Sequence, residues 1–271
     1  MNFYKVDDIF AKLANCIEYN KPFSHIRFGD GGIKFIHSML YDDREQLKII
    51  IEKEGLPPHK IVDIFNLWGY YARHADMIDT PEVYFNGEFW PREKKPNKPI
   101  NAPTEQKLRD WESLYYNSEF DNDNYCNPES NFLMILKRDG KPTLMDFMKD
   151  KKICLITAKP EVKAALSDYN IDVLKIVAHY ENQYQNSFPQ IMEMIHNRAK
   201  DYDFWMVAAG ELGRIYTGAI KKLGGRAIDM GFVIEFWLGA KIHPRFLRFM
   251  ERRNSHELVL TDDGKEFERY I

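Results

Sequence analysis

Short apolar runs alternate with amphipathic stretches through the second half of the chain. Residues 151–158 contain a continuous apolar run, as in strands that are buried on both faces, and residues 173–180, 203–210 and 226–231 also read as strands. Between them, residues 160–169, 187–202 and 213–224 place apolar side chains at helical spacing. Strands that alternate with helices in this way predict a parallel sheet covered by helices.

The first half of the chain begins with the same alternation of helix and strand patterns. Residues 3–19 have helical periodicity, "FSHIRF" (23–28) reads as a strand, and a glycine-rich turn leads into a helical pattern over 32–41. Residues 42–149 are expected to be mostly helix and loop, and 243–271 a basic segment and tail. We therefore predict one α/β domain over residues 1–271, with a Rossmann-like, mainly parallel sheet, helices on both faces and a helical insertion.

Composition and net charge disfavour several classes of function but do not identify one. The chain has 271 residues and a net charge of -3, which gives no overall reason to expect a nucleic-acid or acidic-membrane partner. Its three cysteines are widely spaced, which favours free thiols in a reducing compartment over disulfides or a zinc site. No stretch approaches the ~20 apolar residues of a membrane span, and the N-terminus lacks the pattern of a signal peptide. We expect a cytoplasmic protein.

Two glycine turns carry the candidate chemistry. The first holds Arg27 and Asp30, and the second, within residues 208–231, holds Gly210, Glu211 and Arg214 before a strand that ends at Asp229. Each turn joins a predicted strand to a helix, where free amide groups and the helix dipole attract anions. The second turn has a GxxG spacing rather than the GxGxxG of dinucleotide sites, and a glycine turn without any ligand remains the alternative.

Ligands of open α/β sheets bind at the carboxyl edge, where both turns are expected to lie. Transfer of a sugar from a nucleotide diphosphate needs such parts. A cation or metal must neutralise the leaving diphosphate, and a carboxylate must hold that metal or activate the acceptor.

Three blocks resemble the GT-D glycosyltransferases, a family long catalogued as a domain of unknown function. "IRFGDGG" is similar to that family's IRFGDGE-type opening, "IVAHYENQY" to a middle segment, and "WMVAAGELGRIYTGAIKKLGGRAIDMGFVIEFW" to its closing block. The blocks keep the family's order and span most of the chain. The resemblance implies a hexosyl- or pentosyltransferase that moves a sugar from a nucleotide-sugar donor to a hydroxyl acceptor.

Carried onto this sequence, the resemblance makes Asp30 the first acid of the family's D-x-E metal motif, for Mn²⁺ or Mg²⁺. It places the remaining substrate-binding positions around the sugar nucleotide and its diphosphate, at Arg27, Gly29, Gly31, Asn182, Gly210 and Asp229. Arg214 and Glu211 join this set from their spacing in the second turn, with Glu211 as a candidate catalytic acid beside Asp30.

Two positions depart from the family pattern: Gly32 stands where its second acid is expected, and Phe232 where it has histidine. One carboxylate is a poor Mg²⁺ or Mn²⁺ site. Three readings follow: metal use with Glu211 or Asp229 as second ligand, metal-independent transfer helped by arginines, or a degenerate enzyme that only binds. The histidines lack metal-ligand spacing and are expected to be structural.

The acceptor is not defined by the sequence. A glycan, a lipid-linked glycan or a modified nucleobase all remain open. The C-terminal arginines are either a solvated face or a docking surface for phosphate, on a lipid carrier or nucleic acid: Arg245, Arg248, Arg252 and Arg253. The rival functions are a non-catalytic sugar-nucleotide-binding protein and another Rossmann-like transferase, such as a methyltransferase.

Overall fold

The computed structural model describes residues 2–27, 32, 35–36, 38–39, 42–79, 122, 124–126, 134–135, 137–138, 142–238 and 267–268. Within these residues the main feature is an eight-stranded sheet with the order β1-β4-β3-β2-β9-β8-β6-β7, in which every adjacent pair is parallel. The strands are β1 (Asn2–Tyr4), β2 (Phe23–Ile26), β3 (Met77–Asp79), β4 (Asn124–Cys126), β6 (Ile153–Thr157), β7 (Ile171–Lys175), β8 (Phe204–Ala208) and β9 (Arg226–Asp229). A separate antiparallel pair joins β5 (Lys137–Arg138) to β10 (Phe267–Glu268).

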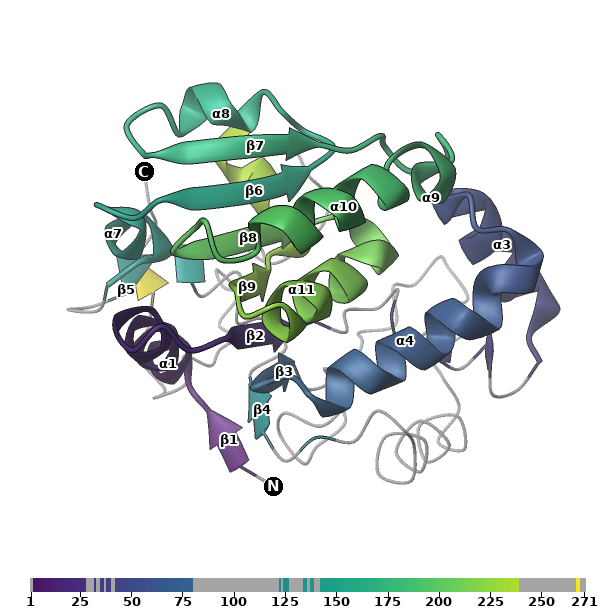
Figure 1. Ribbon diagram of the computed structural model, residues 1–271, viewed down its shortest axis with the longest axis horizontal. Coiled ribbons are helices and arrows are strands. Elements are labelled where there is room, and N and C mark those ends of the chain that lie inside the picture. The colour runs from purple at the N-terminus through teal and green to yellow at the C-terminus, as the bar shows by residue number, and fades with distance from the viewer. Residues whose placement is uncertain are drawn as a thin grey trace, which may run out of the picture.

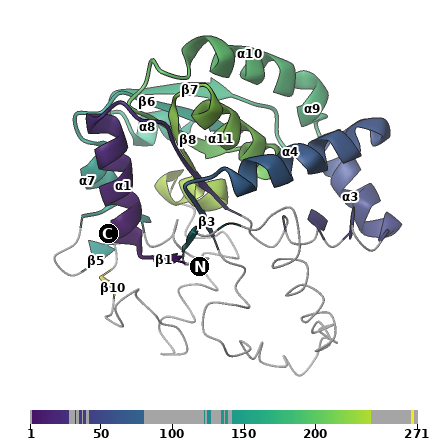
Figure 2. The ribbon, with the colours of Figure 1, turned by 60° about the horizontal axis from the view of Figure 1, so that its bottom comes forward.

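Helices cover both faces of the sheet (Figures 1 and 2). On one face lie α4 (Ile61–Arg73), α10 (Phe188–Arg198) and α11 (Gly213–Lys222). The other face carries α1 (Val6–Glu18), α7 (Leu144–Met148), α8 (Val162–Ala165) and the 3₁₀ helix η3 (Gly231–Leu238). The connections β6–α8–β7 and β7–α10–β8 run in opposite directions along the sheet. Because parallel crossovers keep one hand, the two connections place their helices on opposite faces.

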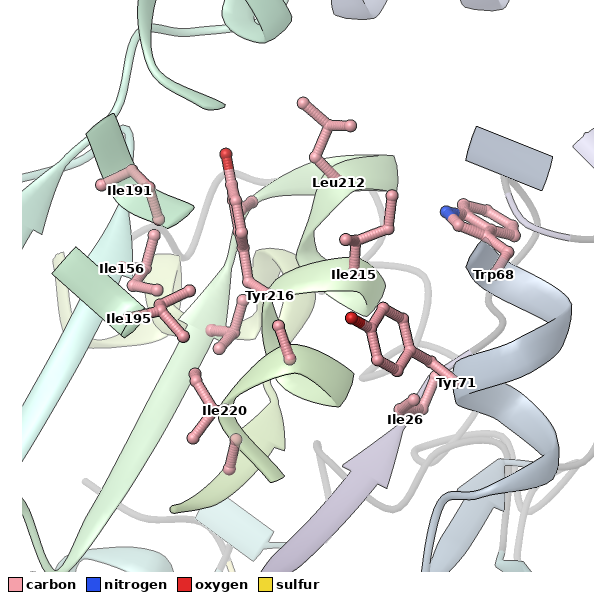
Figure 3. Packing of buried hydrophobic residues seen from close by; sticks show 14 of the residues in the cluster. Ile26, Trp68, Tyr71, Ile156, Ile191, Ile195, Leu212, Ile215, Tyr216 and Ile220 are labelled. Carbon is pink, nitrogen blue, oxygen red and sulfur yellow. The ribbon is translucent and has the colours of Figure 1, made fainter. Parts of the chain in front are cut away.

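Successive residues along a strand contribute side chains to two separate hydrophobic cores, one on each face of the sheet. In β6, Cys154 and Ile156 face the α11 side, while Ile153 and Leu155 face the α1 side. Figure 3 shows the α11 side, where aromatic and branched side chains from α4, α10 and α11 pack over the sheet. The labelled residues are Ile26, Trp68, Tyr71, Ile156, Ile191, Ile195, Leu212, Ile215, Tyr216 and Ile220. Every residue of α11 from Gly213 to Ile220 is buried, so the helix is fixed against the sheet.

The structure confirms the predicted α/β class, the parallel sheet and the helices on both faces. Residues 42–149, expected to be mostly helix and loop, also supply β3 and β4 to the sheet, which the sequence pattern did not predict. The predicted strand 173–180 is wrong in its bounds, because β7 ends at Lys175 and the following residues form a loop. Apart from 267–268, the basic segment 243–271 lies outside the described residues. No helix within the described part of the chain is long and apolar enough to cross a membrane.

Candidate active site at the carboxyl edge of the sheet

Charged side chains gather where β2, β3, β8 and β9 end. Arg27 directly follows β2, Asp79 ends β3, Asp229 ends β9, and Gly210 begins the 3₁₀ helix η2 (Gly210–Leu212) after β8. Since neighbouring parallel strands end at one edge, the structure brings five predicted residues to one region: Arg27, Gly210, Glu211, Arg214 and Asp229. The predicted Asp30, Gly29 and Gly31 lie outside the described residues, and Gly32 is helical and buried.

Arg27 is held by a buried carboxylate that sequence reasoning missed. Its Nε lies 3.3 Å from Oδ2 of Asp79, whose other oxygen lies 2.7 Å from Nε2 of His25. His25 is fully buried, and the Arg27 side chain is 11% exposed. Its guanidinium also packs against the backbone of Gly231, where a Cβ atom would clash with Nη1. The orientation of Arg27 is therefore fixed while part of its surface stays accessible.

Arg214 ties the two turns together. Its Nε donates to the carbonyl of Arg27 at 2.7 Å, and Nη1 donates to the Gly210 carbonyl at 2.9 Å and to Oε2 of Glu211 at 2.7 Å. The guanidinium also lies over the ring of Trp68, 4.6 Å from its centroid, in a cation–π contact. With these contacts to the protein itself, Arg214 is suited to hold the turns in place rather than to receive a ligand.

Glu211 is likewise engaged. Its side chain is 6% exposed and lies between Arg214 and Lys53, whose Nζ is 3.6 Å from Oε1. Lys53 belongs to α3 (Arg44–Glu54), so this carboxylate links α3 to the turn after β8. A general base must reach its substrate proton, and the described contacts of Glu211 are those of a structural ion pair.

Asp229 lies deepest of the predicted residues. It is 3% exposed, and Oδ1 accepts a hydrogen bond from the backbone N–H of Gly231 at 3.0 Å. Burial raises the pKa of Asp229, and the positive charges of Arg214 and Arg27 offset only part of that effect. An acid that resists ionisation here is placed to shape the end of β9 rather than to carry a full negative charge toward solvent.

The turn after β8 needs its glycine. Gly210 has φ +56°, and a Cβ there would clash with Cε1 of His179. Its backbone opens η2, which continues into α11, so this turn points the start of a long buried helix at the carboxyl edge. Helix N-termini of this kind attract phosphate.

Asn182 lies beside this turn but makes no described side-chain contact with the charged cluster. It precedes α9 (Gln183–Asn186), is exposed, and has φ +55°. Its α-carbon packs so closely on Gly55, at the end of α3, that a Cβ on Gly55 would clash with it. Whether the Asn182 amide contacts a ligand stays a prediction.

The described residues do not assemble a metal site. No group of three histidine, cysteine or acidic side chains in the described part of the chain could hold a metal ion. Glu211 is taken by Arg214 and Lys53, and burial favours the protonated form of Asp229. Mn²⁺ or Mg²⁺ binding, with Asp30 as the first ligand and Glu211 or Asp229 as the second, stays a prediction.

Comparisons with known proteins agree with this architecture. No protein-family model and no curated protein matches the chain. Solved structures do match over its whole length. One, described as "A New Glycosyltransferase (DUF1792) from Streptococcus sanguinis", is 16% identical with a TM-score of 0.55 and 95% of its chain covered. Another, described as showing that the domain of unknown function 1792 "has a distinct glycosyltransferase fold", is 14% identical with a TM-score of 0.57 and 92% covered.

The chain thus has the fold described for these glycosyltransferase domains. A selenomethionine-substituted structure of the same domain gives an equal TM-score of 0.57 at 14% identity. The resemblance seen in the sequence blocks is confirmed at the level of the fold.

Proposed function

We propose that this protein is a glycosyltransferase that moves a sugar from a nucleotide-diphosphate donor to a hydroxyl acceptor. The observation that carries the proposal is the whole-length likeness to a structure described as a glycosyltransferase. Independent support comes from the carboxyl edge, where a fixed arginine, a glycine turn and a helix start converge. Open α/β sheets bind nucleotides at this edge.

In this proposal the donor diphosphate lies across the Gly210 turn and faces Arg27. Because Asp79 holds the guanidinium of Arg27, its charge is already oriented when negative charge develops on the leaving diphosphate, and preorganised charge of this kind stabilises the transition state. Arg214 keeps the Arg27 and Gly210 backbones at a fixed separation. Of the open readings, arginine-assisted transfer draws direct support from the described residues. An additional metal at Asp30 remains compatible with it.

The test is thermal unfolding of the protein with a panel of nucleotide-diphosphate sugars, with and without Mn²⁺. A donor at a hundredfold excess over its Kd stabilises the folded state by about 2.7 kcal/mol. We expect one donor class to stabilise the wild type and to release nucleoside diphosphate. Arg27→Met should weaken both, while Asp168→Asn, an exposed acid before β7, should change neither.

Asp30→Asn separates the metal readings. If the Mn²⁺-dependent part of the stabilisation disappears in this variant, Asp30 binds the metal. Stabilisation without any Mn²⁺ effect supports transfer driven by arginine. Binding without release of nucleoside diphosphate would identify a non-catalytic donor-binding protein, and no shift with any donor would refute the proposal.

A further inference from the structure

A histidine and a buried glutamate meet beside the Gly210 turn. Nδ1 of His179, in the loop after β7, lies 3.2 Å from Oε1 of Glu54 at the end of α3. The histidine side chain is 42% exposed, whereas the glutamate side chain is fully buried. Figure 1 shows that this loop leads into α9, and that α3 lies beside α9 at this end of the sheet. The imidazole therefore has Nδ1 at a buried carboxylate, while Cε1 and Nε2 lie toward the Gly210 turn, where a Cβ on Gly210 would clash with Cε1 and stand 3.2 Å from Nε2.

The backbone fixes this pair. The N–H of Tyr180 donates to the carbonyl of Lys53 at 2.7 Å, which ties the loop to the last turn of α3. The N–H of Val177 donates to Oγ of Ser187 at 2.9 Å and holds the start of the loop. The close approach of Asn182 to Gly55 and of His179 to Gly210 packs the loop from both sides.

Burying the Glu54 side chain in these surroundings costs folding free energy. Among the described residues, neither carboxylate oxygen has a partner with full hydrogen-bond geometry, although His179 Nδ1 at 3.2 Å and Lys53 Nζ at 3.5 Å both lie near Oε1. The buried hydroxyl of Tyr216 (Figure 3) also has no hydrogen-bond partner among the described residues. Burial raises the pKa of that tyrosine, and the nearby charge of Glu54 raises it further. A buried charge with such partners is destabilising compared with an apolar side chain, so packing alone does not account for it.

We propose that His179 is the general base of the transfer reaction and that Glu54 positions its ring. This inference rests on the proposed glycosyltransferase function and names a residue for its acceptor half. A carboxylate on Nδ1 favours the tautomer with the proton on Nδ1, which leaves Nε2 to accept a proton. The 3.2 Å separation suits a ligand-free site, because catalytic hydrogen bonds often tighten only when substrate is bound.

The acceptor hydroxyl transfers its proton to Nε2 of His179 while its oxygen bonds to the anomeric carbon of the donor sugar. The bond from that carbon to the diphosphate oxygen breaks, and its electron pair leaves with the nucleoside diphosphate. The developing imidazolium is stabilised by Glu54, and the proton later passes to solvent, to which the side chain is 42% exposed.

Several charges face this histidine. Lys53 and Glu54 come from α3, Glu211 contacts Lys53 from η2, and Glu181 lies in the same loop, where its carboxylate accepts from the N–H of Ala178 at 3.2 Å. Lys53 favours the neutral ring and the three acids favour the charged ring. The test must therefore compare variants rather than interpret a single titration.

The experiment uses the donor that stabilises the full-length protein most, with water as the probe acceptor. Release of nucleoside diphosphate is followed against pH for the wild type, His179→Asn, Glu54→Gln and the control His196→Asn, an exposed histidine on α10. We expect His179→Asn to bind the donor like the wild type, to lose about a hundredfold or more in kcat, and to lose the acidic limb of the pH profile. Glu54→Gln should lower kcat less than His179→Asn does, because the base remains but loses the carboxylate that positions it.

Imidazole added to His179→Ala should restore part of the turnover, which a merely structural role would not allow. The inference is overturned if His179→Asn keeps kcat within threefold of the wild type, or if its pH profile is unchanged. In either case wild-type turnover would leave the glycosyltransferase proposal standing. Failure of the wild type to bind or turn over any donor would overturn both. Should Glu54→Gln fail to fold, the binding, turnover and rescue of the His179 variants still decide.

Discussion

Replacing Arg214 by methionine tests the central contact of the carboxyl edge. The guanidinium makes its three hydrogen bonds to the Arg27 carbonyl, the Gly210 carbonyl and the Glu211 carboxylate, all within 2.9 Å. Methionine keeps much of the side-chain length and its contact with Trp68 but removes every donor. The variant therefore isolates the polar role of Arg214.

The expected loss of stability comes from the Glu211 carboxylate, which stays buried when Arg214 is replaced. Glu211, with 6% of its side chain exposed, keeps only Lys53 at 3.6 Å as a described cation. Removing one partner of a buried ion pair costs about 3–5 kcal/mol because the other charge stays buried. We expect Arg214→Met to lower the free energy of unfolding by that amount. The double variant Arg214→Met/Glu211→Met should lose less than Arg214→Met alone, since no charge is then stranded.

Urea unfolding at pH 7 measures both values, with Arg44→Met as the matched control. Arg44 pairs with Asp42 at 3.1 Å, but its side chain is 85% exposed, and exposed pairs contribute less than about 1 kcal/mol. A loss for Arg214→Met as small as that of the control, or a double variant less stable than the single one, would refute the buried-pair reasoning. In that case the Glu211 carboxylate must find solvent that the structure does not give it.

Three further predictions concern other parts of the fold. Gly210→Ala should lower the free energy of unfolding by about 1 kcal/mol or more, because alanine is strained at positive φ and its Cβ would meet His179; an unchanged urea midpoint would contradict this. Burial raises the pKa of Asp229, so the wild type loses stability as pH rises above the unfolded-state pKa near 3.9. Asp229→Asn should therefore have the same free energy of unfolding as the wild type near pH 3 and a higher one at pH 7. Urea unfolding at pH 3 and pH 7 tests this, and a variant less stable than the wild type at pH 7 would contradict it. Burial raises the pKa of Cys154 to about 12, so iodoacetamide at pH 8 should alkylate the partly exposed Cys16 well before Cys154, which peptide mass spectrometry would confirm or contradict.

The sequence predicts the parts of this fold that local patterns encode. Strands β6 and β8 are mostly apolar runs that alternate with amphipathic helices, and their burial on both faces agrees with that pattern. Strand β9 is equally buried although Arg226 and Asp229 stand at its ends. Strands β3 and β4 escaped prediction because each has only three residues, too few for a period to show. Their place in the sheet is set by pairing with β2 and β1, which is tertiary information.

The candidate site also contains residues that the sequence could identify and residues that it could not. Gly210 and Arg214 were identifiable because the turn and the first helical turn are contiguous in the sequence. Asp79 and Glu54 were not, because each meets its partner across a long stretch of chain and neither lies in a motif. The sequence predicts a structural role for His179 because it lacks the spacing to other histidines that a metal site would show, and its contact with Glu54 is visible only in the fold.

These long-range partners change what the predicted residues can do. The sequence offers Glu211 and Arg214 as free catalytic and binding groups, but the fold turns both inward onto each other, Lys53 and the backbone. Arg27 and His179 stay partly exposed at the same edge, and each is backed by a buried acid from a different element. Lys53 is also partly exposed, but it lies within 3.6 Å of both Glu54 and Glu211. A cation or base held by a buried carboxylate is preorganised for chemistry, which is why the two proposals above give the chemistry to Arg27 and His179 and structural roles to Glu211 and Arg214.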